Sequence, residues 1–316
     1  MAGYDPFSKG PFAAASRSFE LRDDRRGRQF PCHVWYPAGE DESTLPLVLY
    51  SHPAMFHRKA ATFLCEHLCS HGYVVAAMDH SEVVAPELGR QPEGETEEQK
   101  TARWNEVMAS RVPDVLLLLD RMLAGGRQPA IGIVGHSFGG STALSSAEDP
   151  RIRAVVALAP GGASKVRPGV LPIRLALAWG RDVPVLFLVA ENDAALPLEG
   201  MYEIFDRTPA TKQMVVLRQA DHGHFMDGVE ELHEKFRTMP GPPEIAAMQK
   251  DMLPIGELCS GEQGRLFTRG LTLAHFDAVL RGSEDARKFL RGDLQRELAG
   301  RGVDAWVHAT PSAFAS

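Results

Sequence analysis

Residues 135–139 constrain the fold of this chain more than any other stretch, because they read Gly-His-Ser-Phe-Gly and a further glycine, Gly140, follows them. The preceding run, residues 130–134, is apolar and β-prone, as a buried strand would be. A serine in a sharp turn between such a strand and a helix has its hydroxyl pushed out of the sheet, and only glycines leave room for so tight a backbone. The pattern therefore predicts a strand, a turn carrying a nucleophilic Ser137, and a helix. The alternative is a glycine-rich turn with an idle serine.

Apolar β-rich runs alternate with helical patterns along most of the chain, which is typical of a mostly parallel sheet with helices on both faces. Two leading strands are expected as an antiparallel pair, at residues 18–21 and 29–35. Core strands are expected in six further runs, at residues 47–50, 74–78, 130–134, 154–158, 185–189 and 213–217. Helices are expected at 60–71, after Ser137, and in a segment ending at 115–123, where Pro113 marks either a first turn or a kink.

Two segments depart from this alternation. Residues 86–99 are polar and acidic and predict a solvated loop, whereas residues 161–182 are apolar and broken by Gly and Pro, where a lid with 170–179 as its roof could cover Ser137. After Asp227 the chain becomes helical, with helices expected at 243–252 and 283–298. The sequence thus predicts an α/β fold in a single domain, residues 1–316, whose helical C-terminal extension, residues 228–316, packs on the body.

Length and charge exclude several classes of protein. A chain of 316 residues with 44% hydrophobic content can bury one large core. The formal net charge is -7 and no block of Lys or Arg stands out, so the phosphate-neutralising surface of a nucleic-acid binder is missing. No run approaches the ~18 apolar residues of a membrane span, and residues 1–20 lack the pattern of a signal peptide. We expect a cytoplasmic protein, or a mature form whose signal was removed.

The cysteines indicate neither a disulfide framework nor a metal site. Four cysteines in a chain of this length are too few for a disulfide scaffold. Cys65 and Cys69 share one face of the expected helix, while His67 and His71 point the other way, so four ligands cannot converge from it. We expect buried thiols, surface histidines and no metal.

A serine hydroxyl attacks at neutral pH only with a base in hydrogen-bond reach and a third group that orients the base. In a sheet with this strand–turn–helix the chain order is serine, acid, histidine. The strand at 185–189 is followed by Glu191 and Asp193, at the carboxyl end where open α/β sheets place their sites. Asp193 is the preferred acid because its loop can fold back toward the histidine, and Glu191 is its rival.

Two histidines compete for the role of base. The strand at 213–217 is followed by His222 and His224. His222 is preferred because it lies nearer the end of the strand. His224 is the alternative, and otherwise donates a hydrogen bond, borders the pocket or lies on the surface.

A tetrahedral intermediate also needs hydrogen-bond donors aimed at its oxyanion. One is the backbone N–H of Phe138, the residue after the nucleophile. The second should come from the loop after residues 47–50, where Pro53 has no N–H, which leaves Ala54 or Met55. His52 either orders this loop or is a plain loop histidine. Together with Met55 and His224 it is a candidate to border the substrate pocket.

These motifs together resemble the α/β-hydrolases, and more narrowly the plasma-type platelet-activating-factor acetylhydrolases and the predicted dienelactone-hydrolase-like esterases. The resemblance lies in residues 46–55 (PLVLYSHPAM), 67–80 (HLCSHGYVVAAMDH) and 135–142 (GHSFGGST). It implies an α/β-hydrolase fold with Ser137 as the nucleophile. It also implies His222 as the base, because the family's H-x-x-F-x-D run fits residues 222–227.

The chain departs from these relatives at two positions. They usually have glycine where this chain has Pro53, at the oxyanion loop. The plasma-type enzymes place their acid after the strand matching 154–158, where this chain has Pro160, so Asp193 follows the general hydrolase pattern instead. Strict dienelactone hydrolases use a cysteine nucleophile, so Ser137 favours an ordinary ester hydrolase.

The sequence therefore predicts a serine carboxylic-ester hydrolase that works through an acyl-enzyme on small-molecule esters, without a cofactor. The resemblance implies short acyl groups. Two alternatives share the same residues or the same scaffold. One is an acyltransferase using the same triad, and the other is a binding protein that keeps the hydrolase scaffold without its activity.

Overall fold

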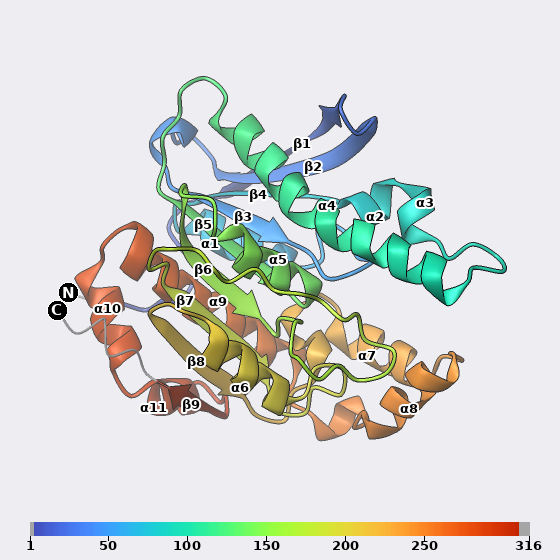
Figure 1. The fold of residues 1–316 in the computed structure, drawn as a ribbon. Coiled ribbons are helices and arrows are strands. Elements are labelled where there is room, and N and C mark those ends of the chain that lie inside the picture. The colour runs from blue at the N-terminus through green and yellow to red at the C-terminus, as the bar shows by residue number, and fades with distance from the viewer. Residues whose placement is uncertain (1–2, 310–316) are drawn as a thin grey trace.

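A computed structural model describes residues 3–309 as a nine-stranded sheet with helices on both faces (Figure 1). The strands lie side by side in the order β1-β2-β4-β3-β5-β6-β7-β8-β9. Their bounds are β1 (Ala14–Asp23), β2 (Arg28–Pro37), β3 (Leu47–Ser51), β4 (Val74–Met78), β5 (Ile131–His136), β6 (Ile152–Leu158), β7 (Val185–Ala190), β8 (Lys212–Leu217) and β9 (Ala305–Ala309).

The centre of the sheet is parallel and its margins are antiparallel. Strands β4, β3, β5, β6, β7 and β8 pair in parallel, while β1 with β2, β2 with β4, and β8 with β9 pair antiparallel. Side chains alternate between two cores, so Leu47 and Leu49 face one layer and Val48 and Tyr50 the other. Because the central strands run the same way, the loops after β3, β5, β7 and β8 leave the sheet at one edge.

Helices cover both faces of this sheet. Helices α1 and α9 pack on one face, and α4, α5 and α6 on the other (Figure 1). The helices are α1 (Thr62–Ser70), α2 (Ser81–Val84), α3 (Pro86–Gly89), α4 (Glu97–Leu123), α5 (Phe138–Ser146), α6 (Leu198–Arg207), α7 (Val229–Thr238), α8 (Pro243–Asp251), α9 (Gly261–Leu280), α10 (Glu284–Arg291) and α11 (Leu294–Ala299). Short 3₁₀ turns lie at Glu42–Thr44, His222–Phe225 and Ile255–Glu257. Along residues 3–309, none of the helices combines the length and apolar character that crossing a membrane requires.

The structure corrects the expected organisation in two places and decides between the two readings of Pro113. The stretch at 86–99 is not simply a solvated loop, because it forms α3 and the start of α4, which Thr96 caps through a reciprocal hydrogen-bond pair with Gln99. Helix α4 continues through Pro113 without restarting. In the C-terminal extension, the helix expected at 283–298 breaks at Gly292, and β9 adds a strand to a segment expected to be helical.

Candidate active site

Ser137 occupies a strained turn between β5 and α5, as the sequence predicts. Its φ of 58° and ψ of -119° place it in a region that residues with a side chain rarely adopt. A Cβ on Gly135 would lie 2.1 Å from the carbonyl oxygen of Gly139, and one on Gly139 would lie 2.0 Å from that of Ser51. Only glycine fits at either position. The N–H of Ser137 donates to the carbonyl of Leu158 at 2.8 Å, which ties the turn to the neighbouring strand.

The loops after β7 and β8 bring Asp193 and His222 together. Oδ2 of Asp193 lies 2.7 Å from Nδ1 of His222, and the carboxylate side chain is 1% exposed. The other oxygen of Asp193 accepts the N–H groups of Ala195 at 2.9 Å and Leu196 at 2.7 Å. Both oxygens of the Asp193 carboxylate therefore accept hydrogen bonds. This places the imidazole proton of His222 on Nδ1 and leaves its Nε2 free to accept a proton.

The imidazole of His222 lies beside the nucleophile turn. Its ring centroid is 4.7 Å from that of His136, the residue directly before Ser137, and His136 also packs on Phe225. Within the described residues no hydrogen bond joins Ser137 Oγ to His222, and catalytic hydrogen bonds of this kind often tighten only when substrate binds. The packing brings the three predicted residues to one edge of the sheet.

Glu191 takes a different place from Asp193. It is partly exposed, accepts the N–H of Gln219 at 2.9 Å and lies 3.7 Å from Arg218. These contacts hold the strand-end loops together at the surface. Asp193, and not Glu191, faces the imidazole of His222.

His224 lies inside the protein and not beside a pocket. It is fully buried, with Nδ1 3.0 Å from the N–H of Asp221 and Nε2 2.9 Å from the carbonyl oxygen of Cys259. Both ring nitrogens are therefore engaged, Nδ1 as acceptor and Nε2 as donor. Its role is to hold the 3₁₀ turn at His222–Phe225 against the start of α9.

Asp221 is a site residue that the sequence reasoning missed. The same oxygen, Oδ1, accepts the N–H of His222 at 2.6 Å and that of Ala194 at 3.0 Å. One buried carboxylate thus ties the loop of His222 to the loop of Asp193. Burial and the neighbouring charge of Asp193 raise the pKa of Asp221. In the sequence it reads as an ordinary residue of a polar loop.

The surroundings of His222 bias it toward the charged form. Burial alone would lower the pKa of His222, but attraction and hydrogen bonding to the Asp193 carboxylate outweigh burial, so the pKa lies above its ordinary value. Burial lowers the pKa of the neighbouring His136 well below that value. An imidazolium at His222 therefore meets a neutral ring on one side and a carboxylate on the other.

The two segments expected to bind an oxyanion lie against each other. Gly139 lies close to the Ser51 carbonyl, so the start of α5 packs directly against the end of β3 and the loop that follows it. Phe138 is the first residue of α5, so its N–H has no acceptor within the helix. Ala54 is half-buried and packs against the apolar cluster of Ala85, Leu88, Val107 and Phe138, which we call the Phe138 cluster. Met55 has a φ of 61° and its side chain is exposed.

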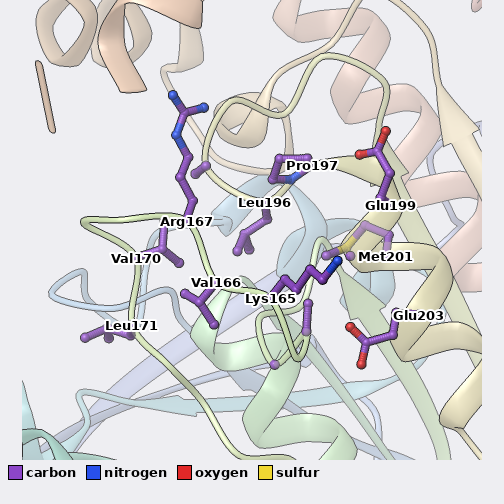
Figure 2. Close-up of a pocket in the computed structure, with 14 residues that line it drawn as sticks. Lys165, Val166, Arg167, Val170, Leu171, Leu196, Pro197, Glu199, Met201 and Glu203 are labelled. Carbon is purple, nitrogen blue, oxygen red and sulfur yellow. The ribbon is translucent and has the colours of Figure 1, made fainter. Parts of the chain in front are cut away.

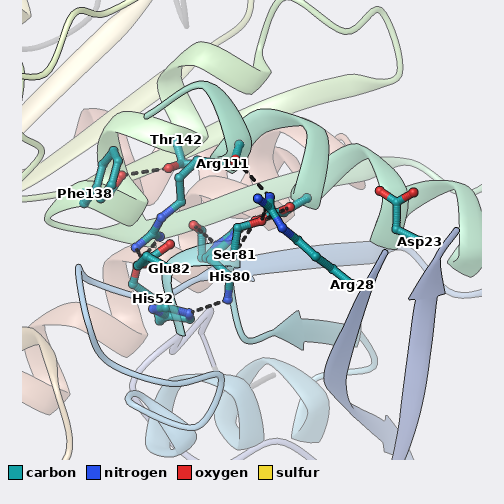
Figure 3. Close-up of polar contacts among 12 residues, drawn as sticks. Asp23, Arg28, His52, His80, Ser81, Glu82, Arg111, Phe138 and Thr142 are labelled. Atoms are coloured by element: carbon teal, nitrogen blue, oxygen red, sulfur yellow. Dashed lines mark hydrogen bonds and ion pairs between the residues drawn. The ribbon is translucent and has the colours of Figure 1, made fainter. Parts of the chain in front are cut away.

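His52 orders the loop after β3 from inside the protein and does not reach a surface pocket. Its side chain is fully buried, Nδ1 donates to the carbonyl of Pro53 at 2.7 Å, and Nε2 accepts the N–H of His80 at 3.0 Å (Figure 3). His80 in turn lies 2.8 Å from the hydroxyl of Ser51. Of the three side chains expected at the pocket, only Met55 reaches the surface.

A cavity of about 480 Å³ opens between the expected lid and the loop of the acid (Figure 2). On one side it is lined by residues of the 162–171 segment, and on the other by Leu196, Pro197 and the start of α6. Arg167 joins the two sides: it donates to the carbonyls of Ala194 at 2.8 Å and Ala247 at 3.2 Å and pairs with Asp251. Ser137, Asp193 and His222 are not among the lining residues of the cavity, and its link to them is Leu196, which lines the cavity and donates its N–H to Asp193.

Only part of the expected roof lies near the nucleophile turn. Leu171 and Ile173 pack against the Phe138 cluster. Trp179 is buried in the core between the sheet and helices α4, α5 and α6. Its indole N–H donates to the carbonyl of Ala176. In the segment 170–179, the first residues therefore pack near Ser137 and the last residues pack in the core.

The Cys–His cluster of α1 is a packing feature. Cys65 and Cys69 are buried, as expected, but His67 is buried too, contrary to the surface position expected for it. Its Nε2 bonds the carbonyl of Pro6, and that of His71 bonds the carbonyl of Ser8. Across the described residues 3–309, no three His, Cys, Asp or Glu side chains gather as metal ligands would.

Comparisons with known proteins give a family, a relative and a likeness of fold. The sequence model of the family described as PET hydrolase-like matches residues 7–237. A probable 1-alkyl-2-acetylglycerophosphocholine esterase of Arthroderma benhamiae is 32% identical over 149 residues, which cover 45% of this chain and 36% of that protein. A ferulic acid esterase from Streptomyces cinnamoneus superposes with a TM-score of 0.63 at 24% identity, over 89% of this chain and 94% of that one. This last likeness concerns the fold.

Proposed function

This chain belongs to the PET hydrolase-like family, and on that premise we propose that it is a serine carboxylic-ester hydrolase with Ser137 as nucleophile, His222 as base and Asp193 as orienting acid. The α/β-hydrolase fold expected from the sequence is confirmed by the likeness to the ferulic acid esterase. The observation that carries the proposal is the 2.7 Å contact between Asp193 and His222 beside the strained turn of Ser137.

In the proposed reaction, Ser137 Oγ attacks the ester carbonyl carbon while Nε2 of His222 takes the hydroxyl proton. The carbonyl oxygen becomes an oxyanion, which the N–H groups of Phe138 and Ala54 would bind. His222 then passes its proton to the departing alcohol, which leaves an acyl-enzyme. A water molecule attacks this ester with His222 again as base, and the carboxylic acid is released.

The proposed substrate is an ester with a short acyl group and an apolar portion elsewhere. The cavity between the 162–171 segment and α6 is lined largely by apolar side chains, among them Val166, Val170, Leu171, Leu196 and Met201. Each methylene buried there contributes up to ~0.8 kcal/mol. The relative named as a probable 1-alkyl-2-acetylglycerophosphocholine esterase, whose named substrate carries one acetyl and one alkyl group, is consistent with this division.

A fluorophosphonate probe tests the proposal directly, because it reacts with activated serines. We expect one adduct per chain, on Ser137, and none on the Ser137→Ala variant. Ser141→Ala is the matched control, since this hydroxyl lies one helical turn away and donates to the carbonyl of Gly161 at 2.9 Å; it should label normally. An adduct on another residue, or no adduct on folded wild-type protein, would contradict the assignment.

A further inference from the structure

A buried ion pair lies beneath the proposed oxyanion loop. Arg111 of α4 and Glu82 of α2 are paired, and their side chains are 1% and 0% exposed (Figure 3). Replacing such a pair by apolar residues of similar size is often neutral or stabilising, because desolvating two charges costs about as much as their attraction returns. A contribution to stability therefore does not by itself explain the Arg111–Glu82 pair. The other contacts of Arg111 indicate a second role.

The guanidinium of Arg111 touches both segments proposed to bind the oxyanion. Nη1 donates to the carbonyl oxygen of His52 at 2.7 Å, and Nη2 lies 3.4 Å from that of Pro53. The central carbon of the same group lies 4.3 Å from the ring centroid of Phe138, a favourable cation–π position. One planar side chain thus contacts the loop after β3 and the first residue of α5.

These contacts fix the direction of one backbone N–H. The Pro53 carbonyl and the Ala54 N–H belong to one planar trans peptide group, so they point in opposite directions. The Pro53 carbonyl is held on the buried side by Nδ1 of His52 and by Arg111. The Ala54 N–H must then face the opposite side, away from the guanidinium.

We propose that Arg111, held by Glu82, is a positioning residue that sets the two donors of the oxyanion hole, the N–H groups of Ala54 and Phe138, at a fixed separation. The inference rests on the proposed function, since it concerns the same oxyanion. It favours Ala54 over Met55 as the second donor. A lysine at 111 would keep the charge but not the fork of donors or the flat face that stacks on Phe138.

Two variants test this role. Arg111→Lys keeps a cation beside Glu82, and the double variant Arg111→Met with Glu82→Leu removes both charges without leaving one unpaired. The matched control is Arg281→Lys at the end of α9. Arg281 also pairs with a carboxylate, Asp277, bonds two backbone carbonyls, those of His71 and Gly72, and stacks on Tyr73, at the edge of the sheet opposite the site. If the double variant does not fold, the lysine variant carries the test.

The readout is hydrolysis of an aryl acetate and of its thionoester analogue. Sulfur accepts hydrogen bonds more weakly than oxygen, so the thionoester gains less from oxyanion donors. We expect kcat on the oxygen ester to fall about 10²-fold in both Arg111 variants, as for a misplacement of ~1 Å, with KM little changed. The rate preference for the oxygen ester over the thionoester should shrink as kcat falls, and Arg281→Lys should match wild type.

The outcomes separate this inference from the proposed function. Folded variants with unchanged kcat, or with equal losses on both substrates, would overturn the role of Arg111 while leaving Ser137 as nucleophile. A wild-type protein that neither hydrolyses the esters nor takes the fluorophosphonate on Ser137 would overturn both, and the missing adduct identifies the proposed function as the point of failure.

Discussion

Asp193→Asn should reduce kcat by about three to four orders of magnitude, and the structure gives the size of the effect. Oδ2 of Asp193 lies 2.7 Å from the imidazole that becomes positive in the transition state, and the carboxylate is buried. Unit charges about 4 Å apart interact by ~4 kcal/mol at an effective dielectric constant of ~20. At about 1.36 kcal/mol per tenfold, losing the charge costs ~10³ in kcat, and a wrongly held imidazole tautomer raises the loss to ~10⁴.

The same variant should shift the pH profile. The base must be neutral to accept a proton, so wild-type kcat/KM should rise with pH through the His222 pKa, which Asp193 holds above the ordinary histidine value of about 6.5. Without the Asp193 charge, burial is opposed only by the weaker attraction of Asp221, so the His222 pKa falls. The rising limb should therefore move to lower pH in Asp193→Asn, while its plateau falls.

The assay is the initial rate of aryl acetate hydrolysis over a range of ester concentrations, which gives both kcat and kcat/KM, between about pH 5 and 9, a range that spans the titration of a histidine. Glu191→Gln is the matched control, because it removes one carboxylate from the same loop but away from His222, and should leave kcat near wild type. Circular dichroism checks that each variant folds. A large loss in Glu191→Gln with a small one in Asp193→Asn would refute the assignment of the acid, and an unmoved pH limb would refute the electrostatic reasoning.

Other substitutions test the rest of the site and its substrate. Ser137→Ala should lower kcat by about 10⁶ while the protein stays folded; activity within about tenfold of wild type would rule the serine out. His222→Ala should lower kcat nearly as much. His224→Ala should mainly lower the melting temperature, because it leaves the Asp221 N–H and the Cys259 carbonyl without a hydrogen-bond partner, at a cost of about 1–3 kcal/mol each. The reverse ranking of the two variants would exchange their roles. On aryl esters, kcat/KM should fall as the acyl chain grows beyond about eight carbons, and a steady rise through palmitate would indicate a lipase-like pocket.

The central strands could be predicted because each is a short apolar run buried on both sides. Leu47–Ser51, Val74–Met78 and Val185–Ala190 are buried at every residue, and a sequence shows that state without help from its neighbours. Strand β9 could not be predicted in this way. Its five residues lie at the sheet margin and pair with β8 about 90 positions earlier in the chain, so the pairing leaves no local pattern.

Helix α9 lies within the extension expected to be helical, but the sequence did not show its bounds. Three glycines, Gly261, Gly264 and Gly270, lower its helix propensity. In the structure they allow close packing: a Cβ on Gly264 would lie 2.7 Å from the carbonyl oxygen of His224, and one on Gly270 would lie 2.2 Å from the ring of Phe7. Tertiary contact thus selects residues that local propensity disfavours.

At the candidate site too, residues that follow a local pattern could be predicted, and residues placed by tertiary contacts could not. The sequence could supply Ser137, Asp193 and His222, because each follows a recognisable strand and stands in a known order. It could not supply Asp221 or Arg111. Both look like surface residues of a polar loop and a charged helix, and their partners come from other elements, as when Arg111 bonds a carbonyl 59 positions away.

The residues missed by the sequence share one physical task, which explains why they are buried. The proposed site is made of loops, and a loop holds a reactive geometry only if its polar groups have fixed partners. Asp221 bonds the loops of the acid and the base, and Arg111 bonds the loop that precedes Ala54. Donors and base fixed in this way need little reorganisation during reaction, which is the condition for electrostatic stabilisation of a transition state. Substitutions at Asp221 and Arg111 should therefore lower kcat more than they raise KM.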